Sequence, residues 1–340
     1  MQARFAGVDA ARGIAILGML WAHTAADGTR DALADGRSSV LFATLAGCSL
    51  GLLTGGSSPR TGRARWEALA SVGLRGLLLI VLGLMLWTLG TPIAVVLDTY
   101  GALFLVLLPV LFAPIRVVAG VGVLAALAGP FVVRAVGEDL ATPFTPERLL
   151  HLPAEWFVTG YYPGVVWAAY LCAGLVAARA GLARRRTLVA MLGAGAATSL
   201  LGYGGAAAFG LDASAHANTS AEVLGSGGLA IAVVGGLELL CSSAVAGRIA
   251  RAVLGPLIAA GRMPLTIYTG QLVVLAIWLR TPAAGDPPWI ESWQLLIGLT
   301  VASLLVAVLW QRFVGRGPLE LLVSRLTAVG VGSAWARPIR

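Results

Sequence analysis

The stretch ALASVGLRGLLLIVLGLMLWTL, residues 68–89, contains a single charged side chain, Arg75. A helix that crosses a bilayer needs roughly 20 consecutive apolar residues, so this stretch alone predicts a transmembrane helix. Similar stretches recur along the chain, and we expect about ten spans. They are 8–26, 39–55, 68–89, 92–112, 117–136, 161–180, 187–208, 223–246, 257–279 and 292–311. The sequence therefore predicts an all-α, polytopic membrane helix bundle.

The composition agrees with a membrane environment. Apolar residues make up 58% of the 340 residues and charged residues only 12%, with a mean hydropathy of +0.86. Little chain remains for a soluble domain, so we expect one integral membrane domain, 1–340, in which 313–340 form a short arginine-rich cytoplasmic tail. The three cysteines fall inside expected spans without paired spacing or a His/Cys cluster, which favours neither a disulfide framework nor a metal site.

The arginines predict the orientation of the chain. The net charge of +8 comes from arginine, because lysine is absent. These arginines gather in alternate loops, which is typical of cytoplasmic loops and excludes a nucleic-acid-binding face. They include Arg60, Arg63, Arg65, Arg116, Arg179, Arg184, Arg185, Arg186, Arg248 and Arg251. The opposite loops hold acidic residues, among them Asp27, Asp31, Asp35, Glu138, Asp139, Glu147, Glu222 and Asp286. Both termini are accordingly expected in the cytoplasm.

The first expected span carries three ionisable side chains on one face. At about 100° per residue, Asp9, Arg12 and His23 share that face, and Asp9 and Arg12 can pair at i and i+3. Arg12 and His23 are separated by about 16 Å along the helix axis, so they would lie at different depths in the membrane and cannot contact each other. A purely structural ion pair and an interfacial histidine remain the alternative interpretations.

Further polar positions lie elsewhere in the chain. Asp98 and Glu238 fall at membrane depth, where ionisable groups are costly and often functional. Arg75 and Arg262 are placed nearer span ends, from which their side chains can reach the membrane surface. The segment His216–Glu222 concentrates polar groups on the side of His23, and its Thr-x-x-Glu pattern predicts a helix cap.

The segment Val8–Met19, VDAARGIAILGM, resembles the opening of bacterial YeiB-like membrane proteins. These proteins are related to heparan-alpha-glucosaminide N-acetyltransferases. The shared features are Asp-x-x-Arg-Gly, followed by a span that ends in a polar residue, here His23. The resemblance extends over most of the chain through the segments Asp35–Arg37, Gly160–Pro163, Glu222–Ser226 and Gly261–Tyr268.

This resemblance implies a multi-pass acyltransferase of the bacterial cytoplasmic membrane. It would move an acyl group, expected to be acetyl, from a cytoplasmic acetyl-CoA or other acyl-CoA donor to a sugar, amine or lipid acceptor outside. His23 would be the general base, and Arg12 and Arg262 would lie near the CoA phosphates. Asp35 and Glu222 would be orienting carboxylates. No covalently bound cofactor is implied, and membrane lipids are the expected surroundings.

One departure from the family pattern matters. The heparan enzymes have a catalytic histidine in the loop after the first span, whereas residues 24–38 contain none, so His23 would act alone or with His216. The alternative function is a non-enzymatic carrier or exporter of a small amphiphile, with Asp98 and Glu238 as proton-coupling carboxylates. The sequence leaves the oligomeric state open.

Overall fold

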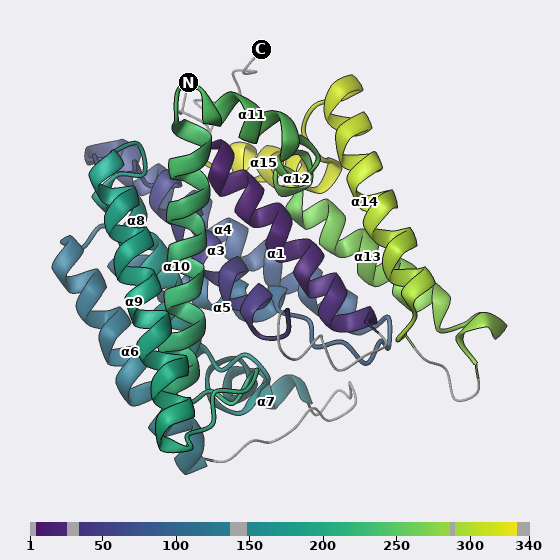
Figure 1. The fold of residues 1–340 in the computed structure, drawn as a ribbon, viewed down its shortest axis with the longest axis horizontal. Coiled ribbons are helices and arrows are strands. Elements are labelled where there is room, and N and C mark those ends of the chain that lie inside the picture. Colours follow the sequence, from purple (N-terminus) through teal and green to yellow (C-terminus); the bar gives the residue numbers. More distant parts are fainter. Residues whose placement is uncertain (1–4, 26–33, 137–147, 286–289, 332–340) are drawn as a thin grey trace.

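A computed structural model describes residues 5–25, 34–136, 148–285 and 290–331, which contain helices and no strand (Figure 1). Several residues used above lie outside this part of the chain. They are Asp27, Asp31, Glu138, Asp139, Glu147, Asp286 and the end of the expected tail, 332–340. The all-α class is confirmed for the described residues.

Five of the described helices are long and apolar enough to cross a membrane. They are α4 (Gly62–Trp87), α6 (Ile115–Val136), α9 (Arg185–Phe209), α10 (Ser220–Ser242) and α14 (Trp293–Phe313). A sixth candidate is a bent pair, in which residues 150–159 meet α8 (Gly164–Ala180) at 62°. The first half of that pair comprises α7 (Arg148–Ala154) and a π-helical turn (Glu155–Thr159). These apolar helices are those of an integral membrane protein.

The remaining described helices are shorter or more polar. They are α1 (Ala6–Thr24), α3 (Arg37–Leu53), α5 (Leu97–Val106), α11 (Ala246–Val253), α12 (Gly255–Gly261), α13 (Pro264–Trp278) and α15 (Pro318–Val331). The prediction of ten spans is therefore confirmed only in part, for five or six helices. The sides on which the termini lie stay a prediction.

Two expected spans are broken helices. Residues 92–112 contain only α5 and a 3-10 turn, and residues 257–279 are divided between α12 and α13 at Arg262. Non-helical backbone at membrane depth is tolerated where protein buries it and satisfies its polar groups. Val95 and Val96 are buried, and the Tyr162 hydroxyl donates to the carbonyl of Ala94 at 3.3 Å. Hydropathy cannot distinguish such buried segments from complete spans.

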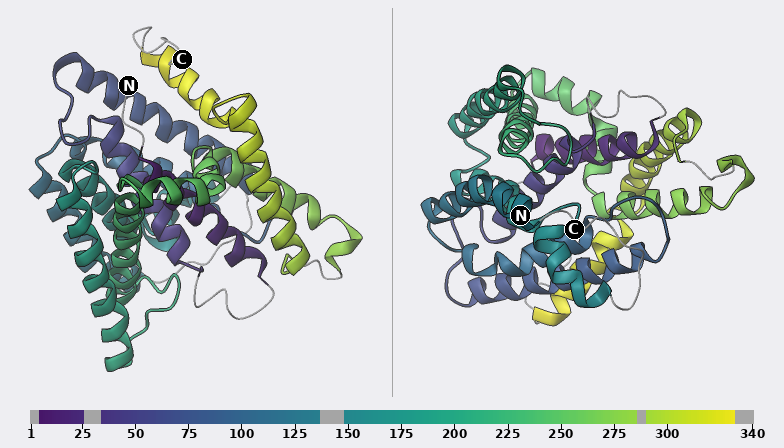
Figure 2. Two further views of the ribbon diagram at one scale, coloured as in Figure 1. Left: turned by 45° about the horizontal axis from the view of Figure 1, so that its top comes forward. Right: turned by 90° about the horizontal axis from the view of Figure 1, so that it is seen from below.

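Helix α1 runs through the interior of the bundle, in contact with α3, α10, α12 and α14 (Figures 1 and 2). Glycines permit this close packing, as is common between membrane helices. A Cβ atom at Gly7 would meet the backbone of Glu238, and one at Gly13 would meet the backbone of Leu257. A Cβ atom at Gly261 would overlap the carbonyl oxygen of Asp9. The polar end of α1 is thus held tightly against α10 and α12.

The substitution Gly261→Ala should destabilise the protein. Because the added methyl group meets backbone and not a movable side chain, we expect a loss of about 1–3 kcal/mol in the free energy of unfolding. Thermal unfolding in detergent measures it. Gly255→Ala is the matched control, since a Cβ atom at that end of the same helix meets nothing within 4 Å. Equal stability of the two variants would contradict the close contact of α1 with α12.

The expected tail contains a packed helix. Helix α15 contacts α4 and α13, and its Glu320 carboxylate caps the first turn of α13. Glu320 accepts hydrogen bonds from the amides of Leu265 (2.7 Å) and Thr266 (3.1 Å) and from the Thr266 hydroxyl (2.6 Å). Met263, the residue before α13, provides no side-chain cap. The end of the chain therefore completes a helix that begins more than fifty residues earlier.

Candidate functional site

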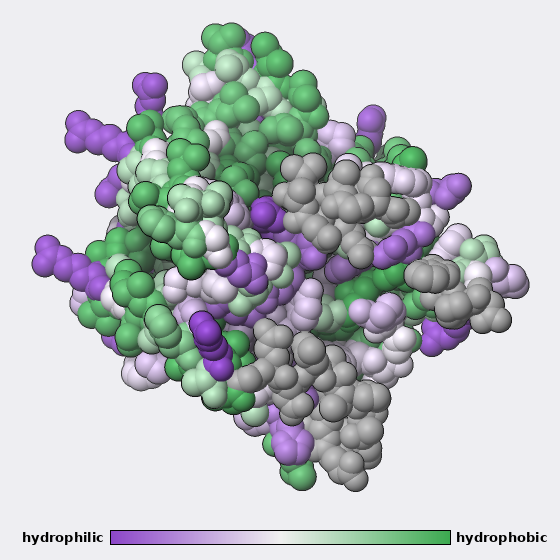
Figure 3. All heavy atoms as spheres, turned by 60° about the horizontal axis from the view of Figure 1, so that its bottom comes forward, coloured by the Kyte–Doolittle hydropathy of each residue, from purple (hydrophilic) through white to green (hydrophobic). Residues whose placement is uncertain are grey.

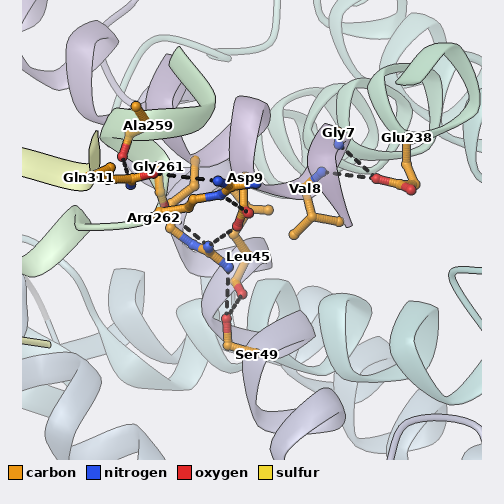
Figure 4. Close-up of polar contacts among 11 residues, drawn as sticks. Gly7, Val8, Asp9, Leu45, Ser49, Glu238, Ala259, Gly261, Arg262 and Gln311 are labelled. Atoms are coloured by element: carbon orange, nitrogen blue, oxygen red, sulfur yellow. Dashed lines mark hydrogen bonds and ion pairs between the residues drawn. The ribbon is translucent and has the colours of Figure 1, made fainter. Parts of the chain in front are cut away.

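The expected ion pair between Asp9 and Arg12 is confirmed and forms part of a larger cluster (Figure 4). Arg12 Nη1 donates to Asp9 Oδ1 and to the carbonyl of Gly261, both at 3.0 Å, and its Nη2 donates to Ser49 Oγ at 3.1 Å. Arg262 Nε donates to the second carboxylate oxygen of Asp9 at 3.2 Å. Asp9 thus joins the two arginines that the family resemblance assigns to the donor. We call Asp9, Arg12 and Arg262 the arginine cluster.

Two neighbouring residues support the arginine cluster but were not predicted. Gln311 Oε1 accepts from Arg262 Nη1 at 3.4 Å, and its amide nitrogen donates to the carbonyl of Ala259 at 2.6 Å. Ser49 is held in α3. The sequence shows only that Gln311 is a polar residue at the end of the apolar stretch 292–311. Because polar residues are common at a membrane surface, this position alone does not indicate a functional role.

Glu238 takes a structural position beside the same cluster. Its Oε2 accepts hydrogen bonds from the backbone amides of Gly7 (2.8 Å) and Val8 (3.3 Å), so it satisfies the first amides of α1 (Figure 4). These contacts make Glu238 a hydrogen-bonded packing residue between α10 and α1.

At the opposite end of α1, Glu222 organises the loop before α10. Its Oε1 accepts from the amide of His216 at 2.8 Å and its Oε2 from the amide of Asn218 at 2.6 Å. His216 and Asn218 have positive φ angles, 60° and 51°, and this backbone conformation is strained for residues other than glycine. Thr219 Oγ1 caps α10 by accepting from the amide of Glu222 at 3.1 Å, as its pattern predicted. The Glu222 carboxylate therefore fixes the backbone at His216.

The His216 imidazole is enclosed on all sides. Its Nε2 lies 3.4 Å from Asp35 Oδ1, and its side chain is only 9% exposed. The ring centroid is 4.1 Å from that of Tyr161 and 5.5 Å from that of Tyr162, and Trp167 stacks parallel to it at 6.3 Å. Nδ1 is buried without a partner. With Nδ1 buried and Nε2 directed at Asp35, His216 is suited to position Asp35.

Asp35, in the turn before α3, contacts His216 and interacts electrostatically with His23. Burial would raise the pKa of its carboxyl, but the hydrogen bond and charge of His216, the amide of Gly36 and, least, the charge of His23 together lower that pKa below its ordinary value. His23 therefore lies within electrostatic reach of Asp35. It is half-buried in the last turn of α1 and has no hydrogen bond to another described residue. Figure 3, turned to bring this end forward, shows polar residues between apolar flanks.

The structure thus separates the predicted site residues into two groups. His23, Asp35, His216 and Glu222 gather at one end of α1, and we call them the histidine group. Arg12 and Arg262 lie in the arginine cluster at the other end. Sequence reasoning missed the packing of Tyr161 and Tyr162 on His216, although the segment Gly160–Pro163 had been noted. Within the described residues no group of His, Cys, Asp or Glu could hold a metal ion.

The pKa of Asp35 predicts a pH-dependent contribution to stability. Because the pKa is depressed in the folded protein, the contribution is present above the unfolded-state pKa and is lost as the pH falls through the folded-state pKa. We expect Asp35→Asn to lower the free energy of unfolding by at most about 1 kcal/mol near neutral pH, since solvent screens a carboxylate that is 30% exposed. The difference from wild type should disappear below about pH 3.

Thermal unfolding across that pH range measures the difference. The control is the same substitution in a His216→Gln background, where Asp35 has already lost its main partner and its replacement should matter little. A difference that persists undiminished in acid would show that Asp35 stabilises the fold by packing and not through its charge.

One comparison bears on the C-terminal part of the chain, from within α8 to α15. Residues 173–330 match the family described as "Protein of unknown function (DUF418)". No curated protein matches the chain. The family comprises uncharacterised YeiB-like membrane proteins, so the match supports the YeiB-like part of the resemblance over these residues. It includes His216, Glu222 and Arg262 but not His23 or Asp35. The relation to acyltransferases belongs to the proposal below.

Proposed function

We propose that this protein is a membrane acyltransferase that moves an acyl group, acetyl above all, from a cytoplasmic CoA thioester to a hydroxyl or amine acceptor on the outer side. The observation that carries the proposal is the contact of Asp35 with His216, within electrostatic reach of His23, at one end of α1, while the other end carries the arginine cluster. One buried helix thus joins a group suited to proton transfer to a group suited to phosphate binding.

His23 is the proton acceptor in this proposal. It is partly exposed in the last turn of α1 and lies within electrostatic reach of Asp35, whereas Nδ1 of His216 is buried and its Nε2 faces Asp35. As the acceptor hydroxyl or amine attacks the thioester carbonyl carbon, His23 takes its proton and the new C–O or C–N bond forms. The C–S bond then breaks, and the protonated imidazole returns the proton to the departing thiolate. The negative charge of Asp35 stabilises the imidazolium.

The other residues position these groups. His216 holds Asp35, and Glu222 holds the backbone of His216. Arg12 and Arg262 bind donor phosphates, which the fork geometry of guanidinium groups suits well. Because about 16 Å of helix separates Arg12 from His23, the donor needs a long arm between its phosphates and its acyl group, as CoA thioesters have.

The orientation is part of the same proposal. In it both termini lie in the cytoplasm of a bacterial cell, as the arginine-rich loops predict, with the arginine cluster facing the donor and the histidine group facing outward. Membrane lipids would surround the apolar helices. The acceptor would be a sugar, an amine or a lipid.

Protein reconstituted into lipid vesicles tests the proposal. Radiolabelled acetyl-CoA is supplied on one side only, and a panel of sugar, amine and lipid acceptors on the other. We expect transfer when the donor faces the arginine cluster and none when it faces the histidine group. Absence of transfer to every acceptor in both arrangements would reject the acyltransferase proposal.

A carrier or exporter of small amphiphiles is the second candidate, and Asp98 favours it. This aspartate is 2% exposed and accepts a hydrogen bond from the indole of Trp156 at 2.9 Å, and no described cation pairs with it. Glu238, the second carboxylate expected to couple protons, instead caps α1. A carrier would need Asp98 for proton-driven efflux from the same vesicles and would show no covalent transfer.

A further inference from the structure

Arg75 lies in the apolar part of α4. The helix begins at Gly62, before the apolar stretch, so Arg75 is near the middle of the helix and in the first half of the apolar stretch 68–89. Its Nε is buried without a hydrogen-bond partner, and no described residue forms an ion pair with it. An arginine at this depth is costly unless a counter-charge or water-filled space accompanies it. This arginine is absent from the proposed mechanism.

A second arginine lies beside it. Helix α15 packs across α4 (Figure 2), and Arg316 immediately precedes α15. Arg316 therefore lies just before the helix that crosses α4, within electrostatic reach of Arg75. Arg316 is exposed, and its carbonyl accepts from the Trp310 indole at 2.9 Å, which fixes its backbone. Neither guanidinium has a carboxylate partner among the described residues.

The loop that carries Arg316 abuts the arginine cluster. A Cβ atom at Gly317 would lie 2.6 Å from Met263 Cβ and 2.9 Å from Thr266 Oγ1, and Met263 directly follows Arg262. Arg12 and Arg262, joined through Asp9, thus lie at the break between α12 and α13. Arg316 is on the loop packed against Met263, and Arg75 is on α4, which α15 crosses. The carboxylates beside them in the described chain are already engaged, and Glu238 among them binds the first amides of α1. Asp9 is shared by Arg12 and Arg262, and Glu320 is bound to the start of α13.

We propose that Arg75 and Arg316 form a second phosphate subsite beside the arginine cluster. The donor class is then one that carries two separate phosphate groups, as a nucleoside 3′-phosphate 5′-diphosphate does. This inference rests on the proposed function, because it assigns the donor of that reaction. Its chemical basis is the strong, often bidentate pairing of guanidinium groups with phosphate. A lipid headgroup offers the same phosphate chemistry, and the experiment separates the two sources.

Binding of CoA and of dephospho-CoA, which lacks only the 3′-phosphate, tests the subsite directly. Isothermal titration calorimetry on the full-length protein in lipid-free detergent gives both dissociation constants. We expect wild type to bind CoA about 10- to 100-fold more tightly, the usual strength of a charge-assisted pair. Arg75→Gln and Arg316→Gln should bind the two ligands equally. Arg316 is exposed, so its variant should fold even if Arg75→Gln does not.

Arg312→Gln is the matched control, because Arg312 lies nearby at the end of α14 over the Phe313 ring and takes no part in the proposed subsite. It should keep the preference for CoA. Equal affinity of wild type for CoA and dephospho-CoA would overturn the inference, as would a preference that survives both subsite substitutions. Phosphate-dependent binding without acyl transfer would leave the subsite standing and reject the proposed reaction.

Lipid nanodiscs provide the second arm. If phosphatidylglycerol raised the melting temperature of wild type above its value in phosphatidylcholine, but did not do so in Arg75→Gln, and this variant kept the preference for CoA, the pair would bind a lipid phosphate. That result would overturn the assignment to the donor. An equal response of wild type and Arg75→Gln to phosphatidylglycerol, together with loss of the CoA preference in the variant, supports it.

Discussion

Replacement of His23 by alanine is expected to lower acyl transfer by about 10²- to 10⁴-fold, the usual cost of removing a general base. The acceptor would then have to lose its proton to solvent as it attacks the thioester. His23 lies at the end of α1 and has no hydrogen bond to another described residue, so its removal should leave the fold and CoA binding unchanged. Initial rates with labelled acetyl-CoA in vesicles measure the loss.

Two further histidine variants make the assignment specific. His151→Ala is the control, because His151 is exposed on α7, and it should keep the full rate. His216→Ala should lower the rate less than His23→Ala and alter the pH profile, since it acts through Asp35. A deeper loss in His216→Ala than in His23→Ala would move the base to His216. Undiminished transfer by His23→Ala would exclude His23 from the reaction.

The second large effect is expected at Arg179, which is 8% exposed. Its Nη1 donates to the carbonyl of Gly56 at 2.7 Å, and its Nη2 donates to Thr54 Oγ1 at 2.7 Å and to the carbonyl of Leu111 at 2.6 Å. One guanidinium thus ties the segment after α3 and the segment after α5 to α8. Arg179→Met keeps much of the volume but leaves these acceptors without a donor in an apolar setting.

We expect Arg179→Met to lower the free energy of unfolding by about 3–5 kcal/mol, because each hydrogen bond to a charged group contributes about 1.5–3 kcal/mol and buried acceptors are costly to leave unpaired. Unfolding in mixed detergent micelles measures the loss. Arg184→Met removes an exposed arginine just beyond the same helix and should change stability by less than about 0.5 kcal/mol. Similar stability of the two variants would show that the carbonyls find other donors.

Local signals predicted local structure well. The apolar stretches predicted a helical membrane protein, the i, i+3 spacing predicted the pair Asp9–Arg12, and Thr-x-x-Glu predicted the cap at Thr219. Each of these depends on residues that are neighbours in the sequence. The same reasoning placed Arg179 in a cytoplasmic loop, because a charge that follows an apolar stretch gives no indication of the distant carbonyls that surround it.

Long-range contacts account for the other differences. Nothing in the sequence near His216 reveals that Tyr161 and Tyr162 enclose its ring. The stretch 257–279 was expected to form one span, yet it divides at Arg262, and the distant Glu320 carboxylate binds the amides of Leu265 and Thr266 just beyond the break. Nothing in the sequence around Arg75 indicates that α15, more than two hundred residues later, crosses α4.

The cap that Glu320 places on α13 has a consequence for biosynthesis. The amides of Leu265 and Thr266 cannot form their hydrogen bonds to Glu320 until the ribosome has added more than fifty further residues. Chains fold from the N-terminus as they emerge, so the hydrogen bonds that cap α13, beside the break at Arg262, form late in synthesis. A premature stop before residue 320 would release a chain whose earlier helices are complete but whose arginine cluster stands beside an uncapped helix.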